Sequence, residues 1–196
     1  MEIVRLGPEG YPAASAVLAR AFFDDPAWVW LIPDPDRRRR LLEPLFRSGF
    51  DVTAADVWAN AGELRGAARW LPPGRPAVRV AATLRALVTT PARLGRTTGP
   101  FLAYGRAVEL MRSEVAGGAH WYLAGIGVDP DAQRQGIGGA LLEPGLVGAA
   151  SQHVPAVLLT NNEANLSFYR GHGFEVVREG RTPAGGPRAW AMVKRP

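Results

Sequence analysis

"VDPDAQRQGIGGALLEPG", Val128 to Gly145, is the most informative stretch of this 196-residue chain. Its glycines Gly136, Gly138 and Gly139 follow an Arg-Gln pair and lead into an apolar helix start. A helix N-terminus carries unpaired backbone N–H groups and a partial positive charge, so it binds phosphate oxygens well. Glycines there remove the Cβ atoms that would hold an anion away, and they permit positive φ angles. The stretch therefore predicts a pyrophosphate cradle between a strand and a helix.

Three known kinds of glycine cradle can be compared with this loop. A Walker loop needs Gly-Lys-Ser/Thr, whereas this loop continues Gly-Gly-Ala at 138–140. The dinucleotide fingerprint needs a third glycine that "GIGGAL" does not supply. The third pattern, Gln/Arg-x-x-Gly-x-Gly/Ala, fits Gln133, Gly136 and Gly138. Arg134 and Gln135 add hydrogen-bond donors at the rim of such a cradle.

Length and composition narrow the class of protein. The length suits a single domain covering residues 1–196. With no cysteine, the chain has no disulfide, thiolate metal site or Cys nucleophile. The apolar runs are too short for a membrane span and the N-terminus does not resemble an export signal, so we expect a cytoplasmic protein.

The net charge of +5 allows two interpretations. One is attraction to a polyanion such as nucleic acid or a phosphorylated cofactor. The other is compositional drift toward arginine, because Lys194 is the only lysine. The dense run Arg37–Arg40 has no interleaved aromatic residue, so we interpret it as a solvated helix start and not as a nucleic-acid groove.

Hydrophobic periodicity predicts an alternation of strands and helices. Strands are expected at 2–6, 57–60, 64–71, 120–128, 156–160, 173–180 and 188–194. Helices are expected within 11–24 and at 35–49, 139–150 and 162–172. Two or three further helices are expected within 77–111, with breaks at Pro91 and Gly99–Pro100. This order is that of a mixed α/β fold around one sheet.

The strand "YLAGIGVDP", the loop "QRQGIGG" and the helix "ALLEPGL" resemble the acetyl-CoA motif of the GNAT superfamily of N-acyltransferases. The block "NEANLSFYRGHGFEVV" is similar to a second motif of that superfamily, and Ala119 to Lys194 resembles its puromycin N-acetyltransferase branch. The first half matches in element order and in "AFFDDP" alone. The resemblance implies a GNAT-like acyl-CoA N-acyltransferase fold. In that fold a mostly antiparallel sheet has helices on both faces, and the strand before the glycine loop splays from the next strand.

The resemblance also implies a site for acetyl-CoA. The backbone of Ile126 and Val128 would pair with the pantetheine arm while their side chains pack in the core. The amides of Arg134 to Gly139 would hold the diphosphate. Asn165 matches a cofactor contact of many relatives, or it is a helix surface or cap residue. The full set of expected cofactor residues is Ile126, Val128, Gln133, Arg134, Gln135, Gly136, Gly138, Gly139 and Asn165.

The catalytic groups are expected at two positions. Tyr169 matches the tyrosine of the superfamily that protonates the leaving thiolate, a role that suits a phenol with a pKa near 10; the alternative is a packed aromatic. The branch has a Glu on the strand after "PA", but Leu159 occupies that position here. His120 is therefore the expected general base, or else a solvated rim histidine. Glu63 and Glu109 are weaker candidates.

His120 starts the central strand, and the alternation of side chains places Tyr122, Ala124, Ile126 and Val128 on the same face as His120. On this reasoning Tyr122 is expected to line the acceptor pocket beside the cofactor. The three histidines have no metal-ligand spacing, and His153 and His172 lie in loop contexts, so no metal is expected.

The acceptor pocket is expected to come from the first half of the chain. Its aromatic residues are Phe22, Phe23, Trp28, Trp30 and Trp70, with Asp24 and Asp25 nearby. Of these we select Phe23 and Trp30, together with Tyr122, as substrate-binding residues. The alternatives are that the aromatics belong to the core and that "DDP" is a helix terminus.

The sequence thus predicts an acetyl-CoA-dependent N-acetyltransferase that acts on a primary amine of a small molecule by direct attack in a ternary complex. An antibiotic-like or aminonucleoside amine would suit it. Two other classes stay open: a non-catalytic acyl-CoA-binding or sensing protein on the same fold, and a basic nucleic-acid-binding domain, which we do not favour. We expect no nucleic acid or membrane partner, and a monomer or homodimer. The amine, the acyl chain and the oligomeric state are not specified by the sequence.

Overall fold

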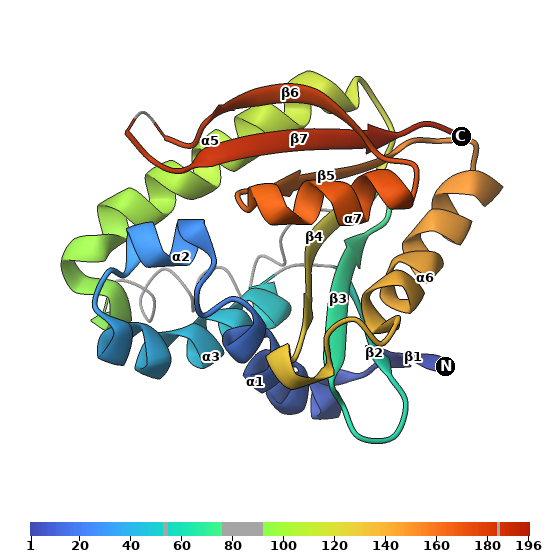
Figure 1. Ribbon diagram of the computed structural model, residues 1–196. Coiled ribbons are helices and arrows are strands. Elements are labelled where there is room, and N and C mark those ends of the chain that lie inside the picture. The colour runs from blue at the N-terminus through green and yellow to red at the C-terminus, as the bar shows by residue number, and fades with distance from the viewer. Residues whose placement is uncertain (53–54, 76–91, 184) are drawn as a thin grey trace.

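The computed structural model describes residues 1–52, 55–75, 92–183 and 185–196, which fold around one seven-stranded sheet (Figure 1). The strands are β1 (Ile3–Leu6), β2 (Asp56–Asn60), β3 (Gly66–Leu71), β4 (Trp121–Val128), β5 (Ala156–Thr160), β6 (Glu175–Arg181) and β7 (Arg188–Lys194). The α-helices are α1 (Tyr11–Ala21), α2 (Pro26–Leu31), α3 (Pro35–Val52), α5 (Thr98–Ala116), α6 (Ile137–Ser151) and α7 (Leu166–Gly171). A short 3-10 turn, η4 (Glu163–Asn165), precedes α7.

The strand order across the sheet is β1-β2-β3-β4-β5-β7-β6. Every neighbouring pair is antiparallel except β4–β5, which is parallel. The predicted mixed α/β class is therefore confirmed. Part of the predicted helical region, 76–91, lies outside the described residues. The predicted break at Gly99–Pro100 is wrong: both residues lie in the first turn of α5, where proline lacks only an N–H that needs no helical partner.

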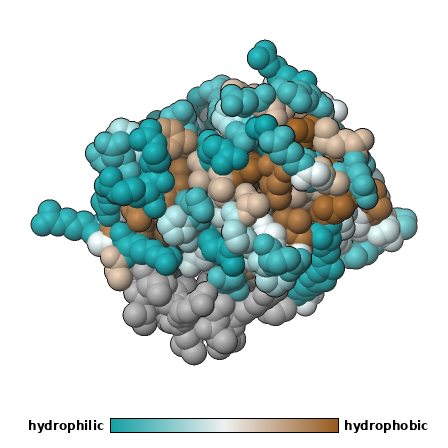
Figure 2. Space-filling view, turned by 90° about the horizontal axis from the view of Figure 1, so that it is seen from below, coloured by the Kyte–Doolittle hydropathy of each residue, from teal (hydrophilic) through white to brown (hydrophobic). Residues whose placement is uncertain are grey.

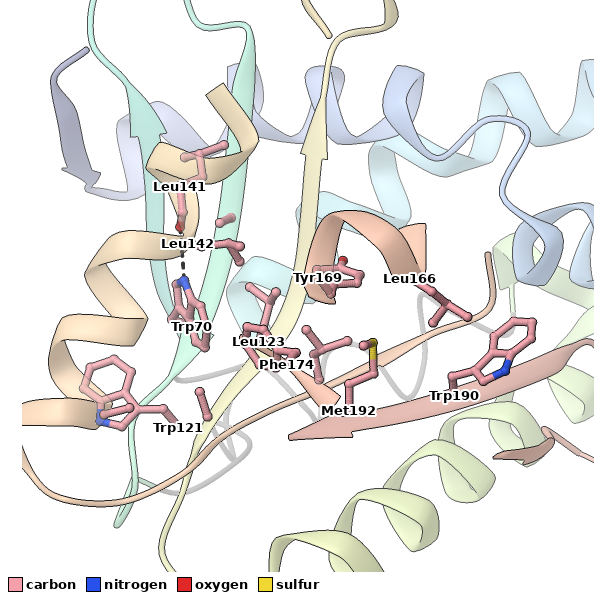
Figure 3. Close-up of a cluster of buried hydrophobic side chains, with 14 of the residues drawn as sticks. Trp70, Trp121, Leu123, Leu141, Leu142, Leu166, Tyr169, Phe174, Trp190 and Met192 are labelled. Carbon is pink, nitrogen blue, oxygen red and sulfur yellow. Dashed lines mark hydrogen bonds between the residues drawn. The ribbon is translucent and has the colours of Figure 1, made fainter. Parts of the chain in front are cut away.

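Helices cover both faces of the sheet. Figure 1 shows α6 and α7 over one face and α1, α3 and α5 over the other. The larger apolar cluster lies under α6 and α7 and includes Trp70, Leu123 and Tyr169 (Figure 3). A second cluster joins α1, α3 and the inner strands on the opposite face. A smaller third cluster packs α5 against β7.

Two glycines let α6 lie unusually close to the sheet. A Cβ added at Gly145 would come within 2.1 Å of Trp70, and one added at Gly148 within 2.4 Å of Trp121. The two indole rings meet edge to face, with centroids 6.4 Å apart. The Trp70 N–H donates to the Leu141 carbonyl at 3.2 Å, which Figure 3 marks with a dashed line. The tryptophans thus fill the space that the missing side chains leave, and they fix the position of α6.

The strands β4 and β5 pair over a short length only. Their register covers Trp121 to Leu123 of β4, although β4 continues to Val128. Beyond Leu123 the two strands separate, while β5 stays paired with β7 to its end. This is the splay that the family resemblance implied.

A β-bulge lies where the strands separate. Along β3, Arg69 and Trp70 are consecutive, but their partners on β4 are Gly125 and Leu123. Ala124 is therefore an extra residue without a partner, and the alternation of side chains reverses across it. As a result Leu123 and Ile126 pack in the same cluster, which an unbroken strand would not allow. The prediction of a single face from His120 to Val128 is wrong for this reason.

Buried carboxylates tie the elements together at the end of β4. Asp129 follows β4 and is 5% exposed. Arg20 of α1 donates to its Oδ2 from Nε at 3.0 Å and from a terminal nitrogen at 2.6 Å. Both donors bind the same carboxylate oxygen, and charge-assisted hydrogen bonds of this kind are stronger than neutral ones. The end of β4 is thus held against α1 just before the glycine loop begins.

The arginine run departs from its predicted role. Arg38 is only 5% exposed, and one guanidinium nitrogen donates to the carbonyls of Ile32 at 2.7 Å and Pro33 at 3.1 Å. These carbonyls follow the end of α2, so Arg38 ties α2 to α3. Arg37 likewise reaches a carbonyl of Leu94. The interpretation of the run as a solvated helix start is wrong for these two residues.

None of the helices within the described ranges is both long and apolar enough to cross a bilayer.

Candidate active site

The glycine loop presents a row of free backbone donors. Arg134 and Gly136 both have positive φ, 62° and 83°. Two left-handed residues so close together turn successive amides toward one side. In the described part of the chain, no residue accepts a hydrogen bond from the backbone N–H groups of 134–139. No side chain caps the N-terminus of α6. The loop therefore offers an unused set of amides at a positive helix end, which fits a diphosphate.

The space in front of these amides is limited by α7. A Cβ added at Gly138 would meet the Phe168 ring at 3.2 Å, and one added at Gly139 would meet Nε2 of His172 at 2.9 Å. The His172 ring is itself fixed by a hydrogen bond between Nδ1 and the Phe168 carbonyl at 2.8 Å. Glycine at both positions thus lets side chains of α7 lie close to the start of α6.

The gap between β4 and β5 presents a second set of backbone groups. The Asp129 N–H donates toward β3, to the Arg65 carbonyl at 2.7 Å. Because successive strand residues direct their N–H and C=O groups to opposite edges, those of Val128 and Ile126 face the gap. Without the bulge at Ala124, residues 125 and 127 would face it instead. Gln133 lies at the end of the gap next to the glycine loop. Its side-chain amide donates to the Val128 carbonyl at 3.3 Å.

Tyr169 lies on α7 beside β4, as Figure 3 shows. It is 6% exposed and packs against Phe168 and Phe174. Its hydroxyl makes no hydrogen bond to a described residue. Burial raises the pKa of Tyr169, and the charge of Asp25 raises it further. The phenol therefore keeps its proton at neutral and moderately alkaline pH, as a proton donor must.

His120 lies apart from the gap. It precedes β4 and lines a cavity of about 150 Å³ with Arg75 and Arg112. His120 lies three residues before Leu123, where β4 and β5 begin to separate. Because a strand rises about 3.3 Å per residue, the two residues are about 10 Å apart. Arg112 contacts Nε2 at 3.0 Å, and Nδ1 lies 2.7 Å from the Gly118 carbonyl. Both ring nitrogens thus have partners, and the structure does not bring His120 together with Tyr169.

The face of the molecule toward which β4 runs is mixed in character. Figure 2 shows apolar side chains gathered in the middle of this face and hydrophilic ones around them. An apolar patch surrounded by hydrophilic residues suits a ligand that has both an apolar arm and charged groups.

Comparisons with known proteins agree with this geometry. Residues 98–176 match the model of the acetyltransferase (GNAT) domain. The match supports the predicted resemblance to the GNAT acetyltransferases over this part of the chain. The finer resemblance to the puromycin branch receives no support from these comparisons.

The solved structures that match the chain share its fold. It is similar to an HPA2-related histone acetyltransferase from Corynebacterium glutamicum, with 22% identity, a TM-score of 0.67, and coverage of 99% of this chain and 95% of that chain. It is also similar to a polyamine N-acetyltransferase from Drosophila melanogaster, with 14% identity, a TM-score of 0.64 and full coverage of both chains. The ribosomal-protein-S18-alanine N-acetyltransferase from Escherichia coli matches with 21% identity, a TM-score of 0.54, and coverage of 99% and 92%.

Proteins of this superfamily are acetyl-CoA-dependent N-acetyltransferases, and the enzyme class predicted from the sequence is confirmed. Among the described residues of the acetyltransferase, no group of three or more His, Asp and Glu side chains could hold a metal ion.

The other site residues predicted from the sequence lie in separate parts of the acetyltransferase. Asn165 is exposed at the end of η4, just before α7, with a free side chain. Leu159, which stands in place of the Glu of the puromycin branch, packs in the α5 cluster. Phe23 lies under the guanidinium groups of Arg38 and Arg39, at 4.6 and 5.3 Å from the ring centroid.

Two of the predicted aromatics belong to packed regions. Trp30 packs against the cluster around Leu31 and Ile32. Trp70 is fully buried, so its alternative as a core residue is correct. Tyr122 is half-buried on the face opposite Leu123 and lies under the Arg112 guanidinium, 5.0 Å from the ring centroid. Burial raises its pKa to about 12.

Two residues gain importance only in the folded acetyltransferase. The Tyr104 hydroxyl of α5 donates to the Oδ1 of Asn161, at the end of β5, at 2.6 Å. Asp25 begins α2, and its carboxylate accepts from the Ala27 N–H at 2.9 Å. Burial raises the pKa of Asp25, and the backbone N–H groups of Ala27 and Trp28 offset part of that rise. The alternative interpretation of "DDP" as a helix terminus is thus correct, and Asp25 is half-buried there.

Proposed function

We propose that the protein transfers an acetyl group from acetyl-CoA to a primary amine of a small molecule, by direct attack within a ternary complex. The observation that carries this proposal is the row of free amides at 134–139, next to a strand gap lined by backbone groups. The absence of cysteine is consistent with direct attack, because no thiol nucleophile exists to carry the acetyl group.

The cofactor contacts follow from these features. The amides of 134–139 would hold the diphosphate, with Gln133, Arg134 and Gln135 adding side-chain donors at the rim. The gap-facing backbone of Ile126 and Val128 would pair with the extended arm in the manner of an added strand. Asn165 would contact the cofactor from η4. When bound, acetyl-CoA supplies an activated thioester at the inner end of the gap.

The residues of the chain then have two tasks: to hold the amine against the thioester, and to move protons. Positioning alone can lower a barrier by several kcal/mol. Tyr169 would donate its hydroxyl proton to the departing sulfur, as its free hydroxyl and raised pKa allow. His120 remains the sequence-based prediction for the base, although both of its ring nitrogens have other partners.

The acceptor is a small-molecule amine in this proposal. The Drosophila relative is named for forming N-acetylagmatine from a polyamine-type substrate, and an agmatine N-acetyltransferase also shares the fold, at 13% identity and a TM-score of 0.59. The resemblance to the puromycin branch suggests an aminonucleoside, but Leu159 departs from that branch. We further propose a single domain over 1–196, a cytoplasmic location, and a monomer or homodimer.

A non-catalytic acyl-CoA-binding protein is the second candidate. Leu159 favours it, because an apolar side chain packed in the α5 cluster stands where the branch has a carboxylate. Thiol release separates the two candidates, since only the enzyme produces free CoA from acetyl-CoA and an amine.

Calorimetry with acetyl-CoA and a free-thiol assay against aminonucleosides, aminoglycosides, polyamines and amino acids test the proposal. We expect micromolar binding and amine-dependent thiol release. Gly138→Asp should abolish binding, because it adds a negative charge where the diphosphate would lie. Gly138→Ala adds the same Cβ, 3.2 Å from Phe168, without the charge and should weaken binding less. Equal binding by the wild type and Gly138→Asp would refute the proposed cofactor site.

A further inference from the structure

Asp25 is a half-buried carboxylate, and it differs from the buried Asp56 and Asp129 in having no cation beside it among the described residues. Asp56 is paired with Arg5, and Asp129 with Arg20. No Arg, Lys or His among the described residues forms an ion pair with Asp25. A desolvated carboxylate is costly unless a cation or several donors compensate for the lost water. The two backbone amides at the start of α2 compensate in part, since the pKa of Asp25 is still raised by burial.

The surroundings of Asp25 belong to the candidate active site. Its charge raises the pKa of Tyr104, on α5, and of Tyr169, on α7. Trp28, one turn after Asp25, packs in the same apolar cluster as Tyr104. Asn161, the partner of Tyr104, directly follows β5 at the open side of the gap.

The side-chain oxygens of Asp25 and Tyr104 can accept hydrogen bonds, but these side chains have few protons to donate. The Tyr104 proton is committed to Asn161, whose side-chain nitrogen is in turn held by the Arg188 carbonyl at 2.7 Å. The Tyr104 oxygen can therefore only accept a further hydrogen bond. The Asp25 carboxylate is an acceptor alone. Two acceptors of this kind are complementary to a ligand that brings several N–H donors and a positive charge.

Aromatic rings pack in the same cluster as Tyr104. Trp28 lies with its ring centroid 6.2 Å from that of Phe101, in a tilted arrangement. Both pack against the cluster that also receives Tyr104. Aromatic faces attract organic cations and pack against their hydrocarbon parts. The composition of this wall suits an ammonium group on an aliphatic or aromatic body.

We propose that Asp25 receives the protonated primary amine of the acceptor, with Tyr104 as a second acceptor, and so selects cationic amines. This inference rests on the proposed function, since it assigns the acceptor side of the same site. The assigned ligand class is a primary alkyl- or arylalkylammonium ion. An amine that is neutral at the working pH gains nothing from this carboxylate.

The chain provides a matched control for the test. Asp24 is the neighbouring carboxylate, but its side chain is 89% exposed and lies 4.0 Å from Arg38. Asp24→Asn and Asp25→Asn make the same chemical change one residue apart. Asparagine caps helices as well as aspartate does, so Asp25→Asn keeps the start of α2.

Isothermal titration at pH 7.5, with CoA present, measures binding of benzylamine and of its neutral isostere benzyl alcohol. The wild type and Asp24→Asn should bind benzylamine more tightly than benzyl alcohol. In Asp25→Asn the affinity for benzylamine should fall by about 10- to 100-fold, the loss expected for a hydrogen-bonded charge pair. The affinity for benzyl alcohol should be unchanged. In thiol release with cationic amines, kcat/KM should fall in Asp25→Asn alone.

Three results would overturn the inference: equal benzylamine affinity in the wild type and Asp25→Asn, equal affinity of the wild type for both probes, or no binding of either probe. Acetyl-CoA binding by the same three proteins separates this failure from a failure of the proposed function. If acetyl-CoA binds without ammonium selectivity, only the role of Asp25 is wrong. If acetyl-CoA does not bind, the cofactor site is wrong, whatever the amine titration gives.

Discussion

The substitution Gly145→Ala should destabilise the fold strongly, because the new methyl group has no space. Its Cβ would lie 2.1 Å from Trp70, a ring with 0% exposure and therefore no open side to move toward. Overpacking of this kind costs about 3 kcal/mol. Displacing the ring also strains the hydrogen bond to Leu141, worth about 1 kcal/mol. The higher helix propensity of alanine offsets about 1 kcal/mol of this loss of stability. The net loss is about 3 kcal/mol, or a melting temperature lower by about 6–12 °C.

Urea unfolding followed by tryptophan fluorescence measures this loss. Gly105→Ala is the matched control, because Gly105 lies inside α5 with nothing within 4 Å of an added Cβ. The control should gain about 0.5–1 kcal/mol from helix propensity alone. The two substitutions should therefore shift stability in opposite directions. If Gly145→Ala also stabilises the protein, the close packing of α6 on Trp70 is not real.

Three further substitutions address the site. Gly136→Ala should cost roughly 1–2 kcal/mol in urea unfolding, because Gly136 has φ of 83° and only glycine adopts that region without strain; an unchanged midpoint would contradict this. Tyr169→Phe should lower kcat in the thiol-release assay by about 100-fold or more while the melting temperature stays near that of the wild type, since the hydroxyl has no partner. Asp25→Asn should be more stable than the wild type at pH 7, with the gain disappearing at low pH. The pKa of Asp25 is higher in the folded state than in the unfolded state, where it is near 3.9. At a pH between these two pKa values the native state holds more protons than the unfolded state. The stability of the wild type therefore falls as the pH rises through this range. Thermal melts of both proteins from pH 3 to 8 measure the difference, and a constant gap across this range would show that Asp25 is not desolvated.

Local patterns in the sequence predicted the elements that carry the cofactor site well. The strand, glycine loop and helix around Gly136 combine alternation, left-handed positions and an apolar helix face, all within residues 121–151. Their arrangement follows from local geometry and needed no information about distant contacts. The separation of β4 from β5 came instead from the family resemblance, because no local pattern marks where a strand loses its partner.

The acceptor side was predicted less well, for physical reasons. A period of two residues assumes an unbroken strand, so it could not reveal that Ala124 is an extra residue and that Tyr122 and Ile126 face opposite sides. Burial of a charged side chain depends on elements far away in the chain. The sequence therefore predicted Arg38 as a solvated residue and Asp25 as a pocket carboxylate or a helix terminus. In the structure Arg38 ties two helices together, and the charge of Asp25 raises the pKa of two tyrosines.

The extra residue in β4 makes the length of that strand a fixed property of the enzyme. Upstream of Ala124 the strand contributes ordinary sheet pairing, and downstream it offers its edge to a ligand. Deletion or insertion of one residue at Ala124 would direct the backbone N–H and C=O groups of Ile126 and Val128 toward β3. A different pair of residues would then face the gap between β4 and β5. Surface loops such as 61–65 can change length without this effect, so variation among functional versions of this protein should collect in the loops and avoid this strand.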